Sequence, residues 1–215
     1  MDDLVKQAMA KWPNVPDCYG WLGLDARGDW YMRDDQAQAL GTFTQSKGSR
    51  LTHEKLIAFI GRNYSATQQG HWYFQNGPQR VFVELEATPW IWRLQPDGSI
   101  HSHVGVTARM QRCIMDEYGR LYLDTELGFG LLQSQDVLAA SELIEAGLWV
   151  PQEVMSQELP QRFTYVRSPQ QAMAKNKNTD FILSIYDVSE DSFPLTFGKP
   201  WRFAKGSVGF IKIKG

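Results

Sequence analysis

The sequence predicts an α+β protein built from two similar hairpin-helix-sheet halves, with mainly antiparallel strands and a few short helices. Apolar and polar residues alternate over several short segments, which is typical of strands. Two segments, residues 24–32 and 115–123, share one frame: apolar, Asp, two variable residues, Gly, one variable residue, apolar, Tyr, apolar. A helical pattern and further strands follow each copy. We therefore expect the chain to divide into residues 1–110 and 111–215.

The first half is expected to begin with a helix over residues 2–12, which Pro13 ends. A hairpin over residues 18–33 follows. Its turn has Asp25 to accept hydrogen bonds and Gly28 to take the left-handed conformation after a type I turn. Residues 34–50 predict a loop with an irregular strand near 40–44. Thr52 is a suitable helix N-cap, so a helix is expected to run from there to Ile60.

The stretch from residue 70 to residue 94 contains three of the eight tryptophans. A strand over residues 72–74 should lead into a corner at Gly77, which Pro78 is expected to hold in extended geometry. From residue 80 the pattern has period two, with Val81, Val83 and Leu85 on one face. Residues 90–94 and 100–106 are expected as the next two strands, joined by a Pro-Asp-Gly turn.

The second half repeats the hairpin around Asp116, with strands at 113–115 and 121–123. A helix over residues 134–146 should follow, with Ser134 as its cap. The candidates for its buried side are Val137, Leu138, Leu143 and Ile144. A capping-box pattern predicts a short helix over residues 168–175. Residues 181–188 predict a strand, and residues 201–203 and 208–213 a closing hairpin.

Composition excludes several classes of protein. Hydrophobic residues make up 43% and charged residues 21% of the 215, and no run approaches the roughly 18 apolar residues of a membrane span. The acidic start lacks the basic region of a signal peptide, which indicates a cytoplasmic protein. A net charge of −2 argues against nucleic acid as a partner. Cys18 and Cys113 lack metal-ligand spacing and are expected to be buried free thiols.

Motifs for catalysis are missing from the sequence. It has no Gly-x-Ser-x-Gly and no phosphate-binding loop, and Gly128-Phe129-Gly130 lacks the third glycine of a dinucleotide fingerprint. His101 and His103 lie two apart in an expected strand, so both could bind a metal from one face. No third ligand can be named, and solvent-facing histidines are the alternative. We therefore predict no catalytic residue, no metal site and no cofactor.

Polar residues around the Gly77 corner indicate a possible ligand site. If the strands that carry Arg80 and Arg93 pair, both guanidinium groups face one side, beside tryptophan rings. That combination suits a phosphate or carboxylate attached to a flat ring. The alternative is that Glu84 and Glu86 pair with the arginines and the tryptophans form core. The predicted ligand-binding residues are Trp72, Gln75, Asn76, Arg80, Trp92 and Arg93.

Three motifs carry a resemblance to known families: CYGWLGLDARGDW, GHWYFQNGPQRVFVELE and MDEYGRLYL. They resemble proteobacterial families of conserved proteins of unknown function. The arrangement of an aromatic DxxGxW hairpin, a helix and another hairpin is similar to one such family, whose fold is a domain duplication with a pleckstrin-homology-like second domain. The resemblance implies a ligand-binding or signalling role, with a site in the groove between the halves. It implies no catalytic residues.

These observations favour a non-enzymatic protein that binds a small anionic or nucleotide-like ligand, or a protein partner. One alternative is a metal-assisted hydrolase that uses His101, His103 or Asp116. Another is a scaffold that forms a homodimer through apolar surface near Trp21 or Trp30.

Overall fold

The computed structural model describes residues 1–172, 182–184 and 210–212. Six strands form the first sheet: β1 (Cys18–Leu24), β2 (Trp30–Met32), β3 (Ser49–Arg50), β4 (Tyr64–Ala66), β5 (Trp72–Asn76) and β6 (Gln79–Leu85). Seven form the second: β7 (Trp90–Leu94), β8 (Ile100–Ser102), β9 (Thr107–Ala108), β10 (Met110–Met115), β11 (Leu121–Thr125), β12 (Gly128–Leu132) and β13 (Pro151–Glu153). A separate antiparallel pair is formed by β14 (Ile182–Ser184) and β15 (Phe210–Lys212).

The two larger sheets are mixed but mostly antiparallel. Their strand orders are β3-β2-β1-β6-β5-β4 and β13-β10-β11-β12-β7-β8-β9. Parallel neighbours are β1 with β6, β12 with β7 and β10 with β13. Short helices pack around these sheets: α1 (Asp3–Lys11), α2 (Asp35–Ala39), α3 (Glu54–Arg62), η1 (Ser134–Asp136), α4 (Val137–Glu145), α5 (Leu159–Arg162) and α6 (Pro169–Ala172). The predicted α+β class with two sheet halves is confirmed.

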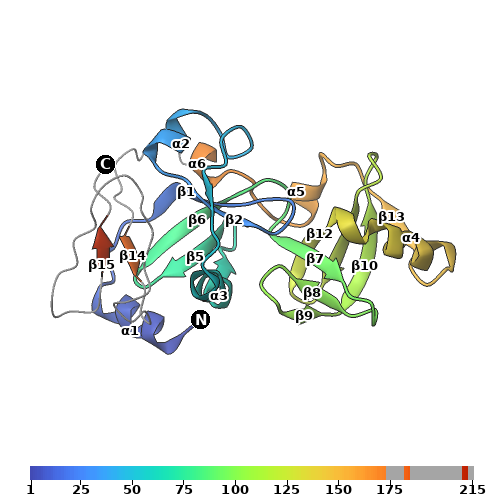
Figure 1. Ribbon diagram of the computed structural model, residues 1–215, viewed down its shortest axis with the longest axis horizontal. Coiled ribbons are helices and arrows are strands. Elements are labelled where there is room, and N and C mark those ends of the chain that lie inside the picture. The colour runs from blue at the N-terminus through green and yellow to red at the C-terminus, as the bar shows by residue number, and fades with distance from the viewer. Residues whose placement is uncertain (173–181, 185–209, 213–215) are drawn as a thin grey trace.

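Figure 1 shows the sheets side by side along the long axis of the molecule, with α1, α2 and α3 around the first and α4 at the far end of the second. The chain passes from one sheet to the other between Leu85 and Trp90, earlier than the boundary expected at residue 110. The division into domains at that boundary stays a prediction. Among the described residues, none of the helices combines the length and apolar character needed to span a bilayer.

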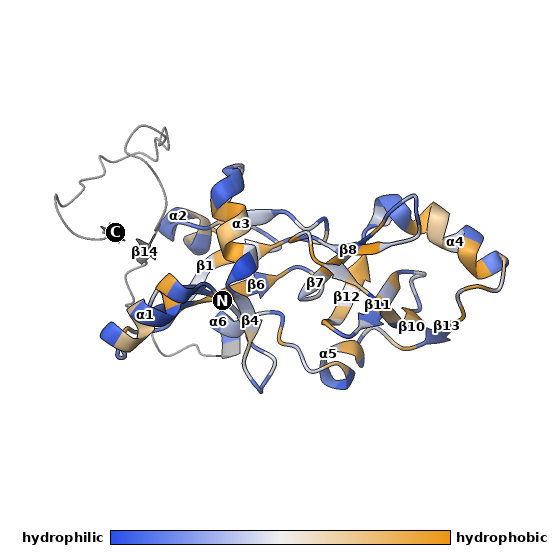
Figure 2. Ribbon diagram, turned by 90° about the horizontal axis from the view of Figure 1, so that it is seen from below, coloured by the Kyte–Doolittle hydropathy of each residue, from blue (hydrophilic) through white to orange (hydrophobic). Residues whose placement is uncertain are grey.

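The hydrophobic core continues from one sheet into the other. One cluster of buried side chains joins Leu22 and Val83 of the first sheet to Ile91 and Leu131 of the second. A second cluster surrounds Trp92. Figure 2 shows that apolar residues follow the strands and also extend onto α4. Both sheets are therefore held by burial of apolar surface at their junction as well as within each sheet.

Trp21 and Trp30 belong to this core and are buried. Neither indole ring is therefore part of an exposed apolar surface, and a homodimer stays a prediction. Cys18 and Cys113 are buried free thiols, as predicted. Burial raises the pKa of the Cys113 thiol to about 11, so it stays protonated at neutral pH.

The two aspartate-glycine hairpins have the predicted turn. Gly28 N donates to Asp25 O at 3.1 Å, and Gly119 N donates to Asp116 O at 2.9 Å. Both glycines have positive φ, +89° and +74°, which glycine adopts without steric strain. The same turn recurs where Gly70 N donates to Thr67 O and Gly98 N to Gln95 O. Because the turn is common to several hairpins, it does not mark a repeat, and the duplication stays a prediction.

Several local expectations are wrong. Residues 40–44 form no strand. They follow the helix α2, which Asp34 caps by accepting a hydrogen bond from Ala37 N at 2.8 Å. The cap of α3 is His53 rather than Thr52. Gly77 has φ +57° rather than extended geometry, because β5 and β6 pair directly on either side of it.

The helix predicted over residues 134–146 starts as the 3-10 turn η1 and continues as α4. Of the residues of α4, Ala140 is buried, whereas Leu138 is 74% exposed. The expectation that Leu138 is buried is therefore wrong. The described strands β14 and β15 fall within the expected segments 181–188 and 208–213. Residues 201–203, and the end of the helix expected over 168–175, lie outside the described residues.

Candidate functional site at the junction of the two sheets

The two predicted site arginines lie in different sheets. Arg80 is in β6 and Arg93 in β7, and these strands do not pair. The expectation that pairing places both guanidinium groups on one side is therefore wrong. Its physical reason is the passage between the sheets at residues 86–89, which separates the two strands.

Each arginine is held by its own carboxylate. Arg80 donates from Nε and Nη2 to the carboxylate of Asp17, at 2.8 and 2.7 Å. Arg93 Nε donates to Asp136 Oδ2 at 2.7 Å. The alternative that Glu84 and Glu86 pair with these arginines is wrong, because the arginines pair with Asp17 and Asp136. Glu86 instead binds Lys47 Nζ at 2.7 Å.

The amides at the Gly77 corner stabilise the chain locally. Gln75 is buried, and its Nε2 donates to Gly77 O at 2.8 Å. Asn76 is also fully buried. In the second sheet, Trp92 is fully buried and its Nε1 donates to Leu123 O at 3.1 Å. The predicted residues thus fall into two separate groups, and their ligand-binding roles stay predictions.

The two histidines differ in their surroundings. His101 Nε2 lies 3.1 Å from Ser99 Oγ, while His103 Nδ1 accepts a hydrogen bond from Ile91 N at 3.3 Å. Across residues 1–172 and the two short described strands, no three His, Cys, Asp or Glu side chains are grouped so that they could hold a metal ion.

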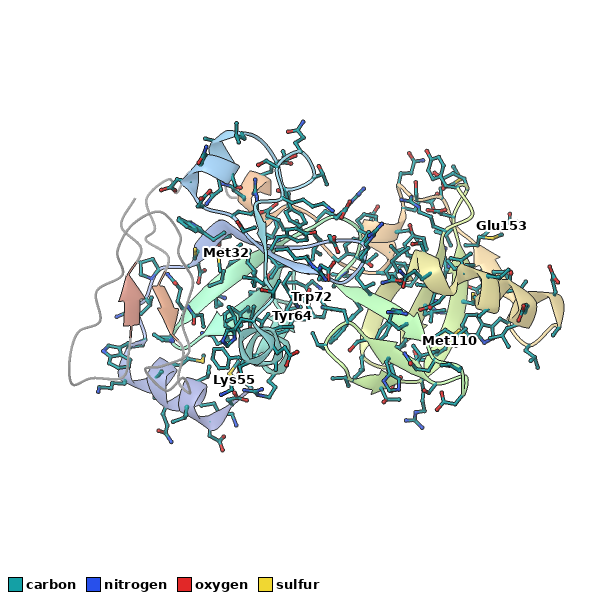
Figure 3. The ribbon with its side chains drawn as sticks, in the orientation of Figure 1. Met32, Lys55, Tyr64, Trp72, Met110 and Glu153 are labelled. Atoms are coloured by element: carbon teal, nitrogen blue, oxygen red, sulfur yellow. The ribbon has the colours of Figure 1, made fainter. Side chains whose placement is uncertain are left out.

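Aromatic rings from both sheets meet where the sheets join. We call this set the junction cluster: Trp30 from β2, Tyr64 from β4, Trp72 from β5, Trp90 from β7 and His103 just after β8. Figure 3 places the labelled Tyr64 and Trp72 at the point where the two sheets meet. The members span residues 30 to 103, and strands of two different sheets bring them together.

Tyr64 is the centre of the junction cluster. Its ring centroid lies 5.3 Å from Trp30, 4.7 Å from Trp72, 5.7 Å from Trp90 and 5.9 Å from His103. Its hydroxyl donates to the carbonyl of Pro89 at 3.0 Å, within the passage between the sheets. Burial raises the pKa of Tyr64 well above its usual value. The phenol therefore remains a neutral donor that fixes the crossing of the chain.

His103 lies between Trp30 and Trp90, with ring centroids at 5.4 and 5.8 Å. Burial lowers the pKa of this imidazole to about 3. Because Nδ1 accepts the hydrogen bond from Ile91 N, we assign the proton of the neutral ring to Nε2. His103 therefore presents a neutral N–H donor to the junction cluster at neutral pH.

Three buried N–H donors of the junction cluster have no hydrogen-bond partner within the part of the chain that the structure describes. They are Trp30 Nε1, Trp90 Nε1 and His103 Nε2. A fourth buried polar atom without such a partner is Gln133 Oε1, an acceptor. Most buried polar atoms in proteins are hydrogen-bonded, and a donor left without a partner costs about 1–3 kcal/mol. Three of these four atoms belong to the junction cluster.

Two glycines make this arrangement possible. A Cβ at Gly28 would lie 2.7 Å from the Cβ of His103, so only glycine lets the first hairpin turn pack against that side chain. Gln133 Nε2 fixes the same turn by donating to Arg27 O at 3.1 Å. A Cβ at Gly128 would lie 3.0 Å from Trp90 Nε1, so glycine also leaves this indole N–H uncovered by a side chain.

The members of the junction cluster differ in exposure. Tyr64, Trp72 and His103 are half-buried as whole residues, while Trp30 and Trp90 are 1% and 9% exposed. The Nε2 atom of His103 and the two indole nitrogens of Trp30 and Trp90 are buried.

Sequence reasoning identified one member of the cluster, Trp72, as a site residue, considered Trp90 as an aromatic neighbour, and assigned His103 to a possible metal site. It missed Trp30 and Tyr64 as site residues. The members come from strands and a turn of two different sheets, so no single local spacing could have joined all five. The available signal was the number of aromatic residues, which does not say which of them meet.

The fold and the junction cluster define a two-sheet α+β protein whose most unusual polar groups lie between its sheets. The chain belongs to the family DUF2944, whose model is described as "Protein of unknown function (DUF2946)" and matches residues 1–170. A search of curated proteins gives no match. Membership agrees with the expected relation to conserved proteins of unknown function, whereas the pleckstrin-homology-like second domain stays a prediction.

Two solved structures are similar to this chain. One is a DUF1285 family protein from Shewanella baltica OS155, with 15% identity, 57% of this chain and 91% of that chain covered, and a TM-score of 0.40. The other is a DUF1285 family protein from Silicibacter pomeroyi DSS-3, with 13% identity, 66% and 85% covered, and a TM-score of 0.43. The likeness is too distant to carry an argument about function.

Proposed function

We propose that the protein is a non-enzymatic binding protein for a small, flat, nucleotide-like ligand that the junction cluster recognises. The observation that carries the proposal is the set of three unpartnered N–H donors, Trp30 Nε1, Trp90 Nε1 and His103 Nε2, buried among aromatic rings. Aromatic faces stack on flat heterocycles, and neutral N–H groups donate to their carbonyl oxygens and ring nitrogens.

The polar groups of the junction favour the base of such a ligand over its phosphate. His103 is neutral because burial lowers its pKa to about 3, and the indole donors carry no charge. Gln133 Oε1 adds an acceptor beside the first hairpin turn, where Gln133 Nε2 donates to Arg27 O. A heterocycle that carries both acceptor and donor atoms would satisfy these groups together.

Recognition of an anion by Arg80 and Arg93 is less favoured. Each guanidinium already binds a carboxylate, that of Asp17 or of Asp136. A phosphate would have to displace that carboxylate, which loses a charge-assisted hydrogen bond for each one gained. The ligand's flat ring is therefore the part we expect the protein to recognise.

The position of the junction cluster supports a proposed role in signalling. Trp30, Tyr64 and Trp72 come from the first sheet, whereas Trp90 and His103 come from the second. A ligand that touches rings of both sheets would stabilise one relative arrangement of the sheets over others, by as much as its affinity differs between them.

A thermal-shift screen tests the proposed function. Free purine and pyrimidine bases, their nucleosides and the matching nucleotides are added to the purified protein. We expect at least one base family to raise Tm by similar amounts as base, nucleoside and nucleotide, because binding to the folded state stabilises it. The shift should decrease in Trp30→Phe and Trp90→Phe, which keep an aromatic ring but lose the N–H donor.

The matched control is Trp149→Phe, which changes a partly buried tryptophan packed in the second sheet's core cluster. It should keep the full shift. A panel that moves nothing, or a shift unchanged in both donor variants, would rule out the junction as the site. A shift produced by nucleotides alone and abolished in Arg80→Ala would assign binding to the anion site that the sequence predicted.

A further inference from the structure

Large apolar side chains are exposed on α4 and on the connection that follows it, at the far end of the second sheet. Leu138 of α4 is 74% exposed, and Leu148 and Val150 in the connection from α4 to β13 are 71% and 76% exposed. Figure 1 shows α4 at this end of the molecule, away from the first sheet. Isolated exposed apolar residues are ordinary, whereas three on one helix and the connection that follows it form a larger exposed apolar set.

The loop after α4 is rigidly built. Gly147 has φ +72°, and its N–H donates to Ile144 O at 2.9 Å, while Leu148 N donates to Leu143 O at 2.9 Å. These two bonds form a Schellman motif. In that motif the residue at the position of Leu148 usually packs against the helix, yet here its side chain is mostly exposed. The backbone is therefore fixed while an apolar side chain faces solvent, so little order is lost on binding.

Exposed carboxylates occur in the same segment of the chain as these apolar side chains. Glu142, Glu145 and Glu153 are exposed, and none of the three forms an ion pair within the described residues. Along the chain, residues 121–161 contain seven acidic residues and no lysine, arginine or histidine. The whole chain has 22 basic and 24 acidic residues, so the remainder is net positive and the negative charge is concentrated in this segment.

The position of these charges does not favour the helix that carries them. Glu142 and Glu145 lie near the C-terminal end of α4, and its last turn contains no basic residue. The negative end of the helix dipole lies there, which disfavours carboxylates. A role outside the stability of α4 accounts for acidic residues at this end.

We infer that this surface binds a segment of a partner protein that carries basic side chains beside apolar ones. We call the surface the α4 tip and define it by its exposed members: Leu138, Glu142, Glu145, Leu148, Val150 and Glu153. Charge complementarity selects the partner. A second copy docked through this same surface would bring like charges together, whereas lysine or arginine of a partner would pair with the carboxylates and its stem would cover the leucines.

This inference is independent of the ligand proposed for the junction cluster, and a random-peptide phage library tests it. The full chain is immobilised, and the peptides it selects are synthesised and titrated by calorimetry. We expect selected peptides to be enriched in Lys or Arg with apolar residues. Their affinity should fall on the order of tenfold in Leu148→Ser/Val150→Ser, and should fall in Glu142→Gln/Glu145→Gln with a weaker dependence on salt.

Matched variants in the helices beside the first sheet provide the controls. Leu40→Ser replaces a leucine that is 72% exposed, and Glu54→Gln replaces an exposed glutamate at the start of α3. Both should bind the selected peptides like the parent. Selection of neutral or acidic peptides, or affinity unchanged in both α4-tip variants, would overturn the inference. Light scattering that shows a dimer lost in Leu148→Ser would overturn it as well, because a second copy would then occupy the surface.

Discussion

His103 and Ile91 are joined by two hydrogen bonds: the backbone N–H of Ile91 donates to His103 Nδ1 at 3.3 Å, and His103 N donates to Ile91 O at 2.8 Å. The first bond needs an unprotonated Nδ1. Protonation of the ring would break it and place a positive charge among buried tryptophans. The imidazole therefore links the charge state of the junction cluster to the pairing of β7 with the chain after β8.

Acid is expected to destabilise the protein through His103. Burial lowers its folded-state pKa to about 3, below the ordinary value of 6.5, so its contribution to stability is present above pH 6.5 and lost as the pH falls toward about 3. Within that window each pH unit costs up to about 1.4 kcal/mol. Urea unfolding across this range measures the slope. The slope should be shallower in His103→Asn than in the parent, and equal slopes would contradict the account.

Arg33 should not tolerate lysine. Its buried guanidinium donates to the carbonyls of four residues, at 2.6–3.4 Å: Gly20, Ala37, Gly41 and Ser46. A lysine ammonium has three donors on one nitrogen, so it cannot donate to all four carbonyls at once. We expect Arg33→Lys to lower the free energy of unfolding by about 2–3 kcal/mol. Arg50→Lys, at an exposed ion pair with Asp29, should change it by less than about 1 kcal/mol, and comparable losses would sink this interpretation.

Asp116 is expected to stabilise the second hairpin more than a turn aspartate usually does. Besides the backbone N–H of Tyr118 and Arg120, its carboxylate accepts from Arg120 Nε at 2.6 Å and Tyr122 Oη at 2.9 Å. Burial alone would raise the pKa of Asp116, but the hydrogen bonds lower it below its usual value. We expect Asp116→Asn to lower unfolding free energy by about 2 kcal/mol. Asp97→Asn, in an exposed turn, serves as the comparison and should cost clearly less.

Glu145→Lys is expected to stabilise the protein while weakening peptide binding at the α4 tip. A cation in place of Glu145 in the last turn of α4 interacts favourably with the helix dipole, worth about 0.3–1 kcal/mol. Thermal unfolding and calorimetry with a selected basic peptide give the two readouts. If the substitution lowered Tm, the dipole argument for a functional role of the acidic residues would be wrong.

Local signals predicted much of this fold because they act over a few residues. The turns at Asp25 and Asp116 each depend on an aspartate and on a glycine three positions later. Strand β6 depends on a simple alternation of apolar and polar residues. Leu138 shows the limit of such reasoning. Helical spacing predicts that Leu138 is buried. The spacing does not tell whether another element covers that face of the helix.

The candidate site was less predictable because its contacts are long-range. Arg80 pairs with Asp17, 63 positions away, rather than with the nearby glutamates. The junction cluster likewise depends on which strands join which sheet, and β6 and β7 are separated although they are neighbours in sequence. Residue types predicted an aromatic site with polar groups, but the fold decides which groups face each other.

The indole N–H resonances give the most direct measurement of the central claim. A nitrogen-15 correlation spectrum of the labelled protein is recorded while a nucleoside from the thermal-shift screen is titrated in. We expect saturable shifts of the Nε1–H signals of Trp30 and Trp90, with those of Trp12 and Trp149 unmoved. Trp30 and Trp90 signals that stay in place while the nucleoside raises Tm would show that the ligand binds elsewhere.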